Sequence, residues 1–137
     1  MEGNYSKRAE EIRQCLKTIL IVDDSRTVRS SLRTSLEQRT DWKICGEAEN
    51  GREGIDQALR LRPDLILLDL SMPVMNGFEA ARELQRLLPK VPILMFTTFC
   101  DAHVERQALA VGVAAVKSKS ESLESLCGSI QDLFEAS

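Results

Sequence analysis

Short apolar runs recur along the chain and alternate with longer segments of mixed character. The runs cover residues 18–22, 43–47, 64–69, 92–97 and 113–117. Each run has the length of a strand, and the third and fourth are nearly continuous in apolar residues. Strands of this kind are typical of a parallel sheet that is covered on both faces. The pattern therefore predicts five buried strands.

Between these runs, apolar residues recur at helical spacing. In the first such segment Val28, Leu32 and Leu36 lie at i, i+4 and i+8 behind Ser25, a helix-capping residue. Similar segments cover residues 52–61, 78–88, 102–111 and 121–134. Alternating strands and helices predict a doubly wound α/β fold, in which a five-stranded parallel sheet is the middle of three layers. Residues 17–137 would form this domain, and residues 1–16 an N-terminal extension that could be helical.

The bulk composition limits what the chain can be. Its 137 residues suit one domain, with 43% hydrophobic and 28% charged residues. The net charge of −3 and the lack of a Lys/Arg run argue against a nucleic acid as direct partner. No apolar stretch approaches the roughly 20 residues of a membrane span, and the start lacks the apolar core of a signal peptide. Four scattered cysteines without a CxxC pattern fit reduced thiols, so we expect a cytoplasmic protein.

Polar and charged side chains gather at the ends of four predicted strands. They are Asp23 and Asp24 after the first strand, Asp69 at the end of the third, Thr97 and Thr98 at the end of the fourth, and Lys117 and Lys119 after the fifth. Open α/β sheets bind ligands beyond the carboxyl ends of their strands. Taken singly, an Asp after a strand is usually a cap or turn residue, and a lone Lys is usually a solvated surface charge. Their joint placement on one rim favours a functional site.

Three carboxylates on one rim repel each other, so a proton or a cation must relieve the repulsion. A cluster of oxygen ligands without His or Cys favours a hard ion such as Mg²⁺, often bound together with phosphate oxygens. The sequence therefore predicts a magnesium site at Asp23, Asp24 and Asp69.

Three segments resemble the motifs of one family. ILIVDDS over 19–25 is similar to its acidic pair, LILLDLSMPVMNGFEAAREL over 65–84 to its phosphoacceptor segment, and MFTT over 95–98 to its fourth strand end. Residues 17–134 thus resemble the receiver domain of bacterial two-component response regulators. The resemblance implies a flavodoxin-like (βα)5 fold. It also implies a chain that is not an enzyme but a phosphoacceptor taking part in its own phosphorylation and autodephosphorylation.

The resemblance also implies roles for single residues. Asp69 would be the phosphoacceptor. Asp24 would bind Mg²⁺ directly, Asp23 would help through water, and Ser71 would offer its backbone carbonyl. Thr97 would be the hydroxyl that turns toward the phosphoryl group, with Thr98 beside it. The family's lysine follows that hydroxyl by 22 residues, which selects Lys119 over Lys117.

The chain departs from the family pattern in the fifth-strand region. Ser120 stands where the family usually has a proline after the lysine, so a cis bond there would cost about 3–4 kcal/mol. Val116 stands where a switching aromatic residue is often found, and Thr98 fills a position that is often smaller. These departures bear on how the signal is read out more than on the chemistry.

The expected function is a phosphorylation-dependent signalling switch. Its partners would be a histidine kinase or phosphotransfer protein and an unidentified downstream protein, with no membrane and no direct nucleic acid partner. A phosphorylation-dependent dimer is a further expectation. The chain could be a stand-alone receiver or one excised from a longer regulator. A phosphorylation-independent interaction module is the alternative, while an aspartate-based phosphatase would need an Asp at position 71, where Ser71 stands.

Overall fold

The structure is a computed structural model that describes residues 16–136. One sheet contains five strands: β1 (Thr18–Val22), β2 (Lys43–Ala48), β3 (Leu65–Leu68), β4 (Ile93–Thr97) and β5 (Ala115–Ser118). Between and after them lie the helices α2 (Arg26–Arg39), α3 (Gly51–Leu61), α4 (Gly77–Leu87), α5 (Ala102–Ala110) and α6 (Leu123–Ala136). Nearly all of the extension predicted over 1–16 falls outside the described residues.

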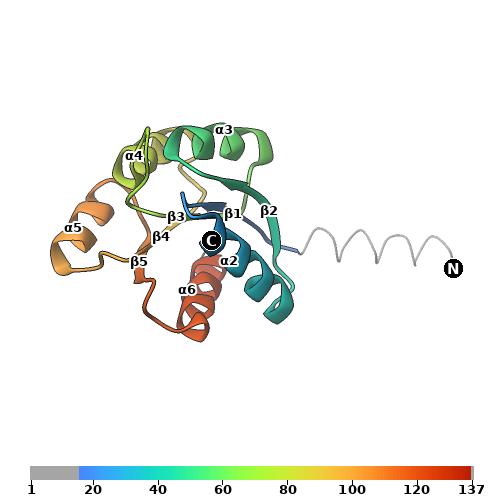
Figure 1. Ribbon diagram of the computed structural model, residues 1–137. Coiled ribbons are helices and arrows are strands. Elements are labelled where there is room, and N and C mark those ends of the chain that lie inside the picture. The colour runs from blue at the N-terminus through green and yellow to red at the C-terminus, as the bar shows by residue number, and fades with distance from the viewer. Residues whose placement is uncertain (1–15, 137) are drawn as a thin grey trace, which may run out of the picture.

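All strand pairs are parallel, and the strand order is β2-β1-β3-β4-β5 (Figure 1). The predicted doubly wound, three-layer α/β fold is therefore confirmed. Because β1 lies between β2 and β3, the strand order reverses at the carboxyl end of β1. Ligands of open α/β sheets bind at such a point.

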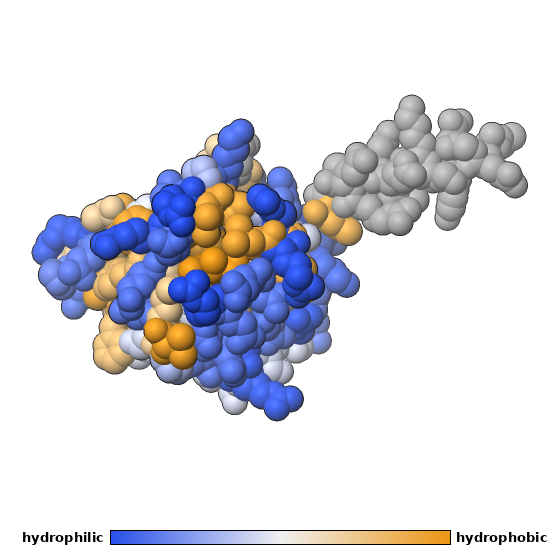
Figure 2. Space-filling model, turned by 90° about the horizontal axis from the view of Figure 1, so that it is seen from above, coloured by the Kyte–Doolittle hydropathy of each residue, from blue (hydrophilic) through white to orange (hydrophobic). Residues whose placement is uncertain are grey.

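The core has two apolar layers, one on each face of the sheet. Residues from α3, α4 and α5 pack on one face, and residues from α2 and α6 pack on the other. Within β1, Leu20 and Val22 point to the first layer, while Ile19 and Ile21 point to the second. This double burial explains why the strands lack polar alternation. Figure 2 shows the face covered by α3 and α4, where an apolar area is flanked by polar side chains.

Three predicted boundaries in the C-terminal third were wrong by two residues. The fifth strand begins at Ala115, not at 113, because Gly112 adopts a positive φ of 98° and the Val113 N–H closes the end of α5 on the Ala108 carbonyl. Lys117 was predicted to follow this strand but lies within β5, whereas Lys119 follows it. The last helix covers Leu123–Ala136 rather than 121–134. Within the described residues, no helix is both long and apolar enough to cross a membrane.

Candidate functional site

Asp23 directly follows β1 and is almost fully buried, with 3% of its surface exposed. Its N–H donates to the Ala48 carbonyl at 3.0 Å, which extends the pairing of β1 with β2 by one residue. Its Oδ1 accepts from the Ser25 N–H at 2.8 Å, and Ser25 is the N-cap of α2. The end of the strand and the start of the helix thus hold this carboxylate in place.

Asp69 follows β3 and has 5% of its surface exposed. Its N–H donates to the Val22 carbonyl at 2.9 Å, and its Oδ1 accepts from the Leu70 N–H at 2.9 Å. The loop after it folds back closely, because the Gly77 N–H donates to the Leu70 carbonyl at 2.8 Å. A Cβ at Gly77 would collide with the Asp69 carbonyl oxygen, so this turn requires glycine.

The three predicted metal ligands lie together. One carboxylate oxygen each from Asp23, Asp24 and Asp69 falls within 4.8 Å of the others, and Asp24 alone of the three is exposed. All three donors are oxygens, which is the ligand set that a hard divalent cation such as Mg²⁺ prefers. The donor chemistry therefore fits the predicted ion.

A lysine faces these acids from the end of β5. Lys119 Nζ lies 2.7 Å from Asp23 Oδ2 and 3.5 Å from Asp69 Oδ1. Lys117 instead lies 3.3 Å from Ser125 Oγ and 3.6 Å from Glu121 Oε1. The structure therefore brings Lys119, not Lys117, to the acid cluster.

The electrostatics of the site follow from burial and from these neighbours. Burial and then the negative charge of Asp23 raise the pKa of Asp69 to about 6, although Lys119 works in the opposite direction. Burial disfavours the charged form of Lys119, but the hydrogen bond and charge of Asp23, together with Asp69, raise its pKa. Lys119 is thus a cation at neutral pH. Asp69 gains its negative charge only as the pH rises through about 6.

Thr97 ends β4 with 1% of its surface exposed. Its Oγ1 accepts from the Phe99 N–H at 3.2 Å, and its carbonyl accepts from the Lys119 N–H at 2.9 Å. The hydroxyl therefore ties the loop that leads into α5. Thr98 and Ser71 are exposed on the same rim, and their roles stay predictions.

The peptide bond between Lys119 and Ser120 is trans. Ser120 Oγ instead pairs with Ser118 Oγ at 2.7 Å, and the Ser120 N–H donates to Ser118 Oγ at 3.1 Å. The serine that replaces the usual proline therefore shapes this turn through hydrogen bonds. Val116, at the position of the often aromatic switch residue, packs at the margin of the first core layer.

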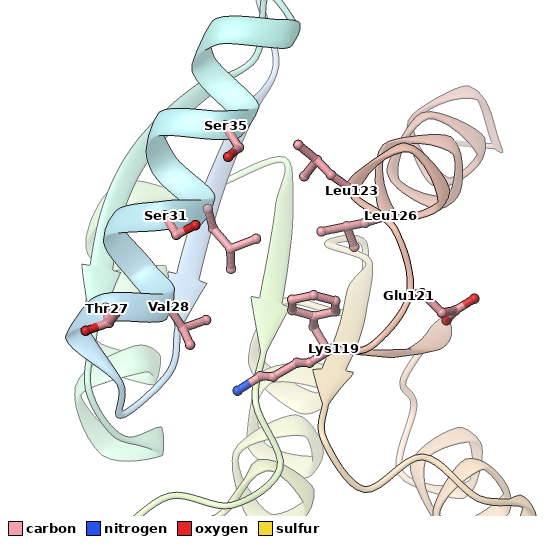
Figure 3. A pocket seen from close by; sticks show the side chains of 10 residues that line it. Thr27, Val28, Ser31, Ser35, Lys119, Glu121, Leu123 and Leu126 are labelled. Atoms are coloured by element: carbon pink, nitrogen blue, oxygen red, sulfur yellow. The ribbon is translucent and has the colours of Figure 1, made fainter.

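A groove of about 340 Å³ opens beside the acid cluster, between α2 and the start of α6 (Figure 3). Its apolar lining consists of Val28, Leu32, Phe96, Leu123 and Leu126. Two hydroxyl side chains of α2, Ser31 and Ser35, also line it. Lys119 lines the same groove while its Nζ reaches the two buried acids. The groove therefore adjoins the site directly.

Sequence reasoning missed Arg29, whose Nη1 donates to the main-chain carbonyl of Asp23 at 2.6 Å. Glu47 holds the same guanidinium from β2. An arginine one turn into an amphipathic helix gives no sign of this contact, because the partner is a backbone atom.

Comparison with known proteins identifies the family. Residues 19–131 match the family described as the response regulator receiver domain. A protein-glutamate methylesterase/protein-glutamine glutaminase of Hahella chejuensis is 42% identical over 80% of this chain and 28% of its own length. The transcriptional regulatory protein LnrK of Bacillus subtilis is 36% identical over 79% of this chain and 49% of its own length. The chain thus spans half or less of the length of these two relatives.

Solved structures agree with the match. A LuxR-family two-component response regulator from an Aurantimonas species has a TM-score of 0.85 at 26% identity, covering 88% of this chain and 86% of that one. The response regulator domain of Thermotoga maritima CheB has a TM-score of 0.81 at 26% identity, covering 88% and 97%. By its fold, its acid cluster and these likenesses, the chain belongs to the response regulator receiver domain family.

Proposed function

We propose that this chain is a signalling switch in which Asp69 accepts a phosphoryl group from a histidine kinase or phosphotransfer protein. Receiver domains of response regulators act in phosphorylation-dependent signalling generally. The observation that carries the proposal is the convergence on Asp69 of one lysine and two further aspartates. Such a site can both attract and neutralise a phosphoryl group.

In the proposed reaction, a carboxylate oxygen of Asp69 attacks the phosphorus of a phosphohistidine. The new O–P bond forms as the P–N bond breaks, and the electron pair of that bond stays on the imidazole nitrogen of the donor. With a pKa of about 6, Asp69 is mostly ionised at neutral pH and ready to attack. Lys119, 3.5 Å away, would counter the charge that gathers on the phosphoryl oxygens. Water later attacks the phosphorus and returns the free carboxylate with inorganic phosphate.

The residues that would hold Mg²⁺ are Asp23, Asp24 and Asp69, with the backbone carbonyl of Ser71. When bound, the ion supplies positive charge to the acids and to the incoming phosphoryl oxygens. Asp23 also keeps Lys119 in place through its 2.7 Å contact, so one buried carboxylate serves both the cation site and the lysine.

The proposed response begins at Thr97. Phosphorylation gives Asp69 nearly two negative charges and three strong acceptor oxygens. In the unphosphorylated structure the Thr97 hydroxyl accepts from the Phe99 N–H. Turning toward the phosphoryl group as a donor would give up that bond and release the loop before α5. The phosphorylated state would thereby favour a different arrangement of α5 and β5 and a different protein partner.

The test uses a small phosphodonor, which needs no cognate kinase. The chain is incubated with acetyl phosphate or phosphoramidate and Mg²⁺, and its intact mass is measured. We expect a gain of one phosphoryl group that is absent in Asp69→Asn and without Mg²⁺. If the chain stays unlabelled under conditions that label an ordinary receiver, the phosphorylation-independent interaction module becomes the leading account.

A further inference from the structure

Asp23 is buried, and each of its four polar atoms has a partner. Its N–H bonds to β2, its Oδ1 accepts from the N-cap of α2, and its Oδ2 contacts Lys119. The fourth partner is Arg29, which donates from Nη1 to the main-chain carbonyl at 2.6 Å. Asp23 comes after the last residue of β1, so its carbonyl accepts a hydrogen bond from a side chain and not from a neighbouring strand.

Arg29 is itself held firmly. Its side chain is 13% exposed, and its Nε donates to Glu47 Oε1 at 3.1 Å. The second carboxylate oxygen of Glu47 accepts from Arg33 Nε at 2.8 Å, one helical turn further along α2. A planar guanidinium that makes two directed bonds has little freedom to move. The Asp23 carbonyl is thus fastened to β2 through Arg29 and Glu47.

An irregularity in β2 explains why Glu47 reaches Arg29. Ile19 pairs with Ile44, but Leu20 pairs with Gly46, so Cys45 is an extra residue in the ladder. Paired residues of parallel strands share a face, and Glu47 pairs with Ile21, whose side chain packs on the face covered by α2. Without the extra residue, alternation would turn Glu47 to the face of α3.

We propose that Arg29, held by Glu47, is a positioning residue for the divalent-cation site. Its hydrogen bonds go to Glu47 and to the main-chain carbonyl of Asp23, and the second of them fixes the main chain between the side chains of Asp23 and Asp24. Groups that orient metal ligands in this way commonly change metal affinity when they are removed. The inference rests on the proposed function, because it concerns the cation site used there.

The sign of the effect separates positioning from charge. Arg29 is a cation near an acidic cluster, so its charge alone repels Mg²⁺, and removing that charge would tighten binding. Loss of positioning would weaken Mg²⁺ binding instead, because the carboxylates of the metal-free protein would no longer be held in the arrangement that binds the ion. Arg29→Lys retains the charge and cannot make both directed bonds. Arg33→Met is the matched control, since it removes a cation from the same Glu47 without touching Asp23.

The experiment measures Mg²⁺ affinity by isothermal titration calorimetry for the wild type, Arg29→Lys, Arg29→Met and Arg33→Met. We expect both Arg29 variants to bind Mg²⁺ about tenfold more weakly and Arg33→Met to bind as well as the wild type or better. Metal-free amide hydrogen exchange provides a second readout. The Ser25 N–H, which donates to Asp23 Oδ1, should exchange faster in the Arg29 variants alone.

Urea unfolding of each variant shows whether it is folded in the titration, and Arg29→Lys serves if Arg29→Met is not. Unchanged or tighter Mg²⁺ binding by the Arg29 variants, with wild-type exchange at Ser25, would overturn the positioning role and leave the proposed function standing. An equal loss in Arg33→Met would overturn it too, by showing a general effect of the ion-pair cluster. A wild type that binds no Mg²⁺ would overturn both proposals.

Discussion

At the residue scale, burial and the neighbouring charge of Asp23 disfavour the ionised form of the Asp69 carboxyl group. Its pKa of about 6 exceeds the ordinary value of 3.8, so between these values the folded chain binds a proton that the unfolded chain releases. The free energy of unfolding therefore falls as pH rises through this window. Well above pH 6 the charged carboxylate costs about 3 kcal/mol, because the pKa shift is about two units and each unit is worth about 1.4 kcal/mol.

Asp69→Asn removes this charge in a side chain of the same shape. In EDTA the variant should be more stable than the wild type above pH 6, by up to about 3 kcal/mol. The difference should shrink as pH falls toward 4 and disappear well below pH 3.8, where the wild-type carboxyl is protonated in both states. Urea unfolding across this pH range measures it. A constant difference at every pH would show that the variant acts through packing and not through charge.

Gly77 and Gly128 make a second prediction at this scale. A Cβ at Gly77 meets the backbone of Asp69 and Leu70, which cannot move aside, whereas a Cβ at Gly128 finds nothing within 4 Å. Gly77→Ala should therefore destabilise the fold by about 1–3 kcal/mol, and Gly128→Ala should stabilise α6 by about 0.5–1 kcal/mol. Urea unfolding of both variants compares them. Equal effects at the two positions would contradict the close approach at Gly77.

At the element scale, α2 contributes side chains to the core, to the acid cluster and to the groove. Leu32 and Leu36 pack in the second core layer, Arg29 reaches Asp23, and Ser31 lines the groove beside Lys119. A protein that delivers a phosphoryl group to Asp69 must cover the rim around it. The apolar lining of the adjoining groove is suited to such a contact.

Ser31→Trp would fill this groove without touching the acids. It should slow phosphoryl transfer from a histidine kinase that labels the wild type, by about tenfold if 1.4 kcal/mol of docking energy is lost. Labelling by acetyl phosphate should be unchanged, since a small donor needs no docking surface. Gln38→Trp, at an exposed position near the far end of α2, is the control. Equal slowing with both donors would mean that the tryptophan disturbs the chemistry itself.

The elements also show what can be predicted from sequence. Uninterrupted apolar runs predicted a doubly covered sheet, and the strand ends predicted that Asp23, Asp24 and Asp69 would meet, because parallel strands end at one edge. The start of β5 was missed, since buried Val113 resembles a strand residue although its N–H closes α5. Arg29 was missed because an extra residue in β2 turns Glu47 to the other face. A single extra residue of this kind does not change the pattern of apolar and polar residues in a way that the sequence reveals.

At the scale of the whole molecule, the fold holds an excess of negative charge that a cation should relieve. Asp23 and Asp69 are buried with one lysine between them, and Asp24 adds a third carboxylate nearby. A ligand that binds only the folded state raises its stability by RT ln(1 + [L]/Kd). Mg²⁺ at ten times its Kd should therefore add about 1.4 kcal/mol to the free energy of unfolding.

This stabilisation should depend on the same carboxylate that destabilises the metal-free fold. Asp69→Asn lacks both the charge penalty and one ligand, so its melting temperature should exceed that of the wild type in EDTA and rise less on adding Mg²⁺. The difference in melting temperature between the two proteins should narrow as Mg²⁺ is added. A titration with Na⁺ to the same ionic strength, in buffer free of Ca²⁺, is the control. Parallel rises in both proteins would place the ion away from Asp69. A narrowing gap would mean that the strain of the acid cluster is what the cation relieves, which couples metal binding to the residue proposed to take the phosphoryl group.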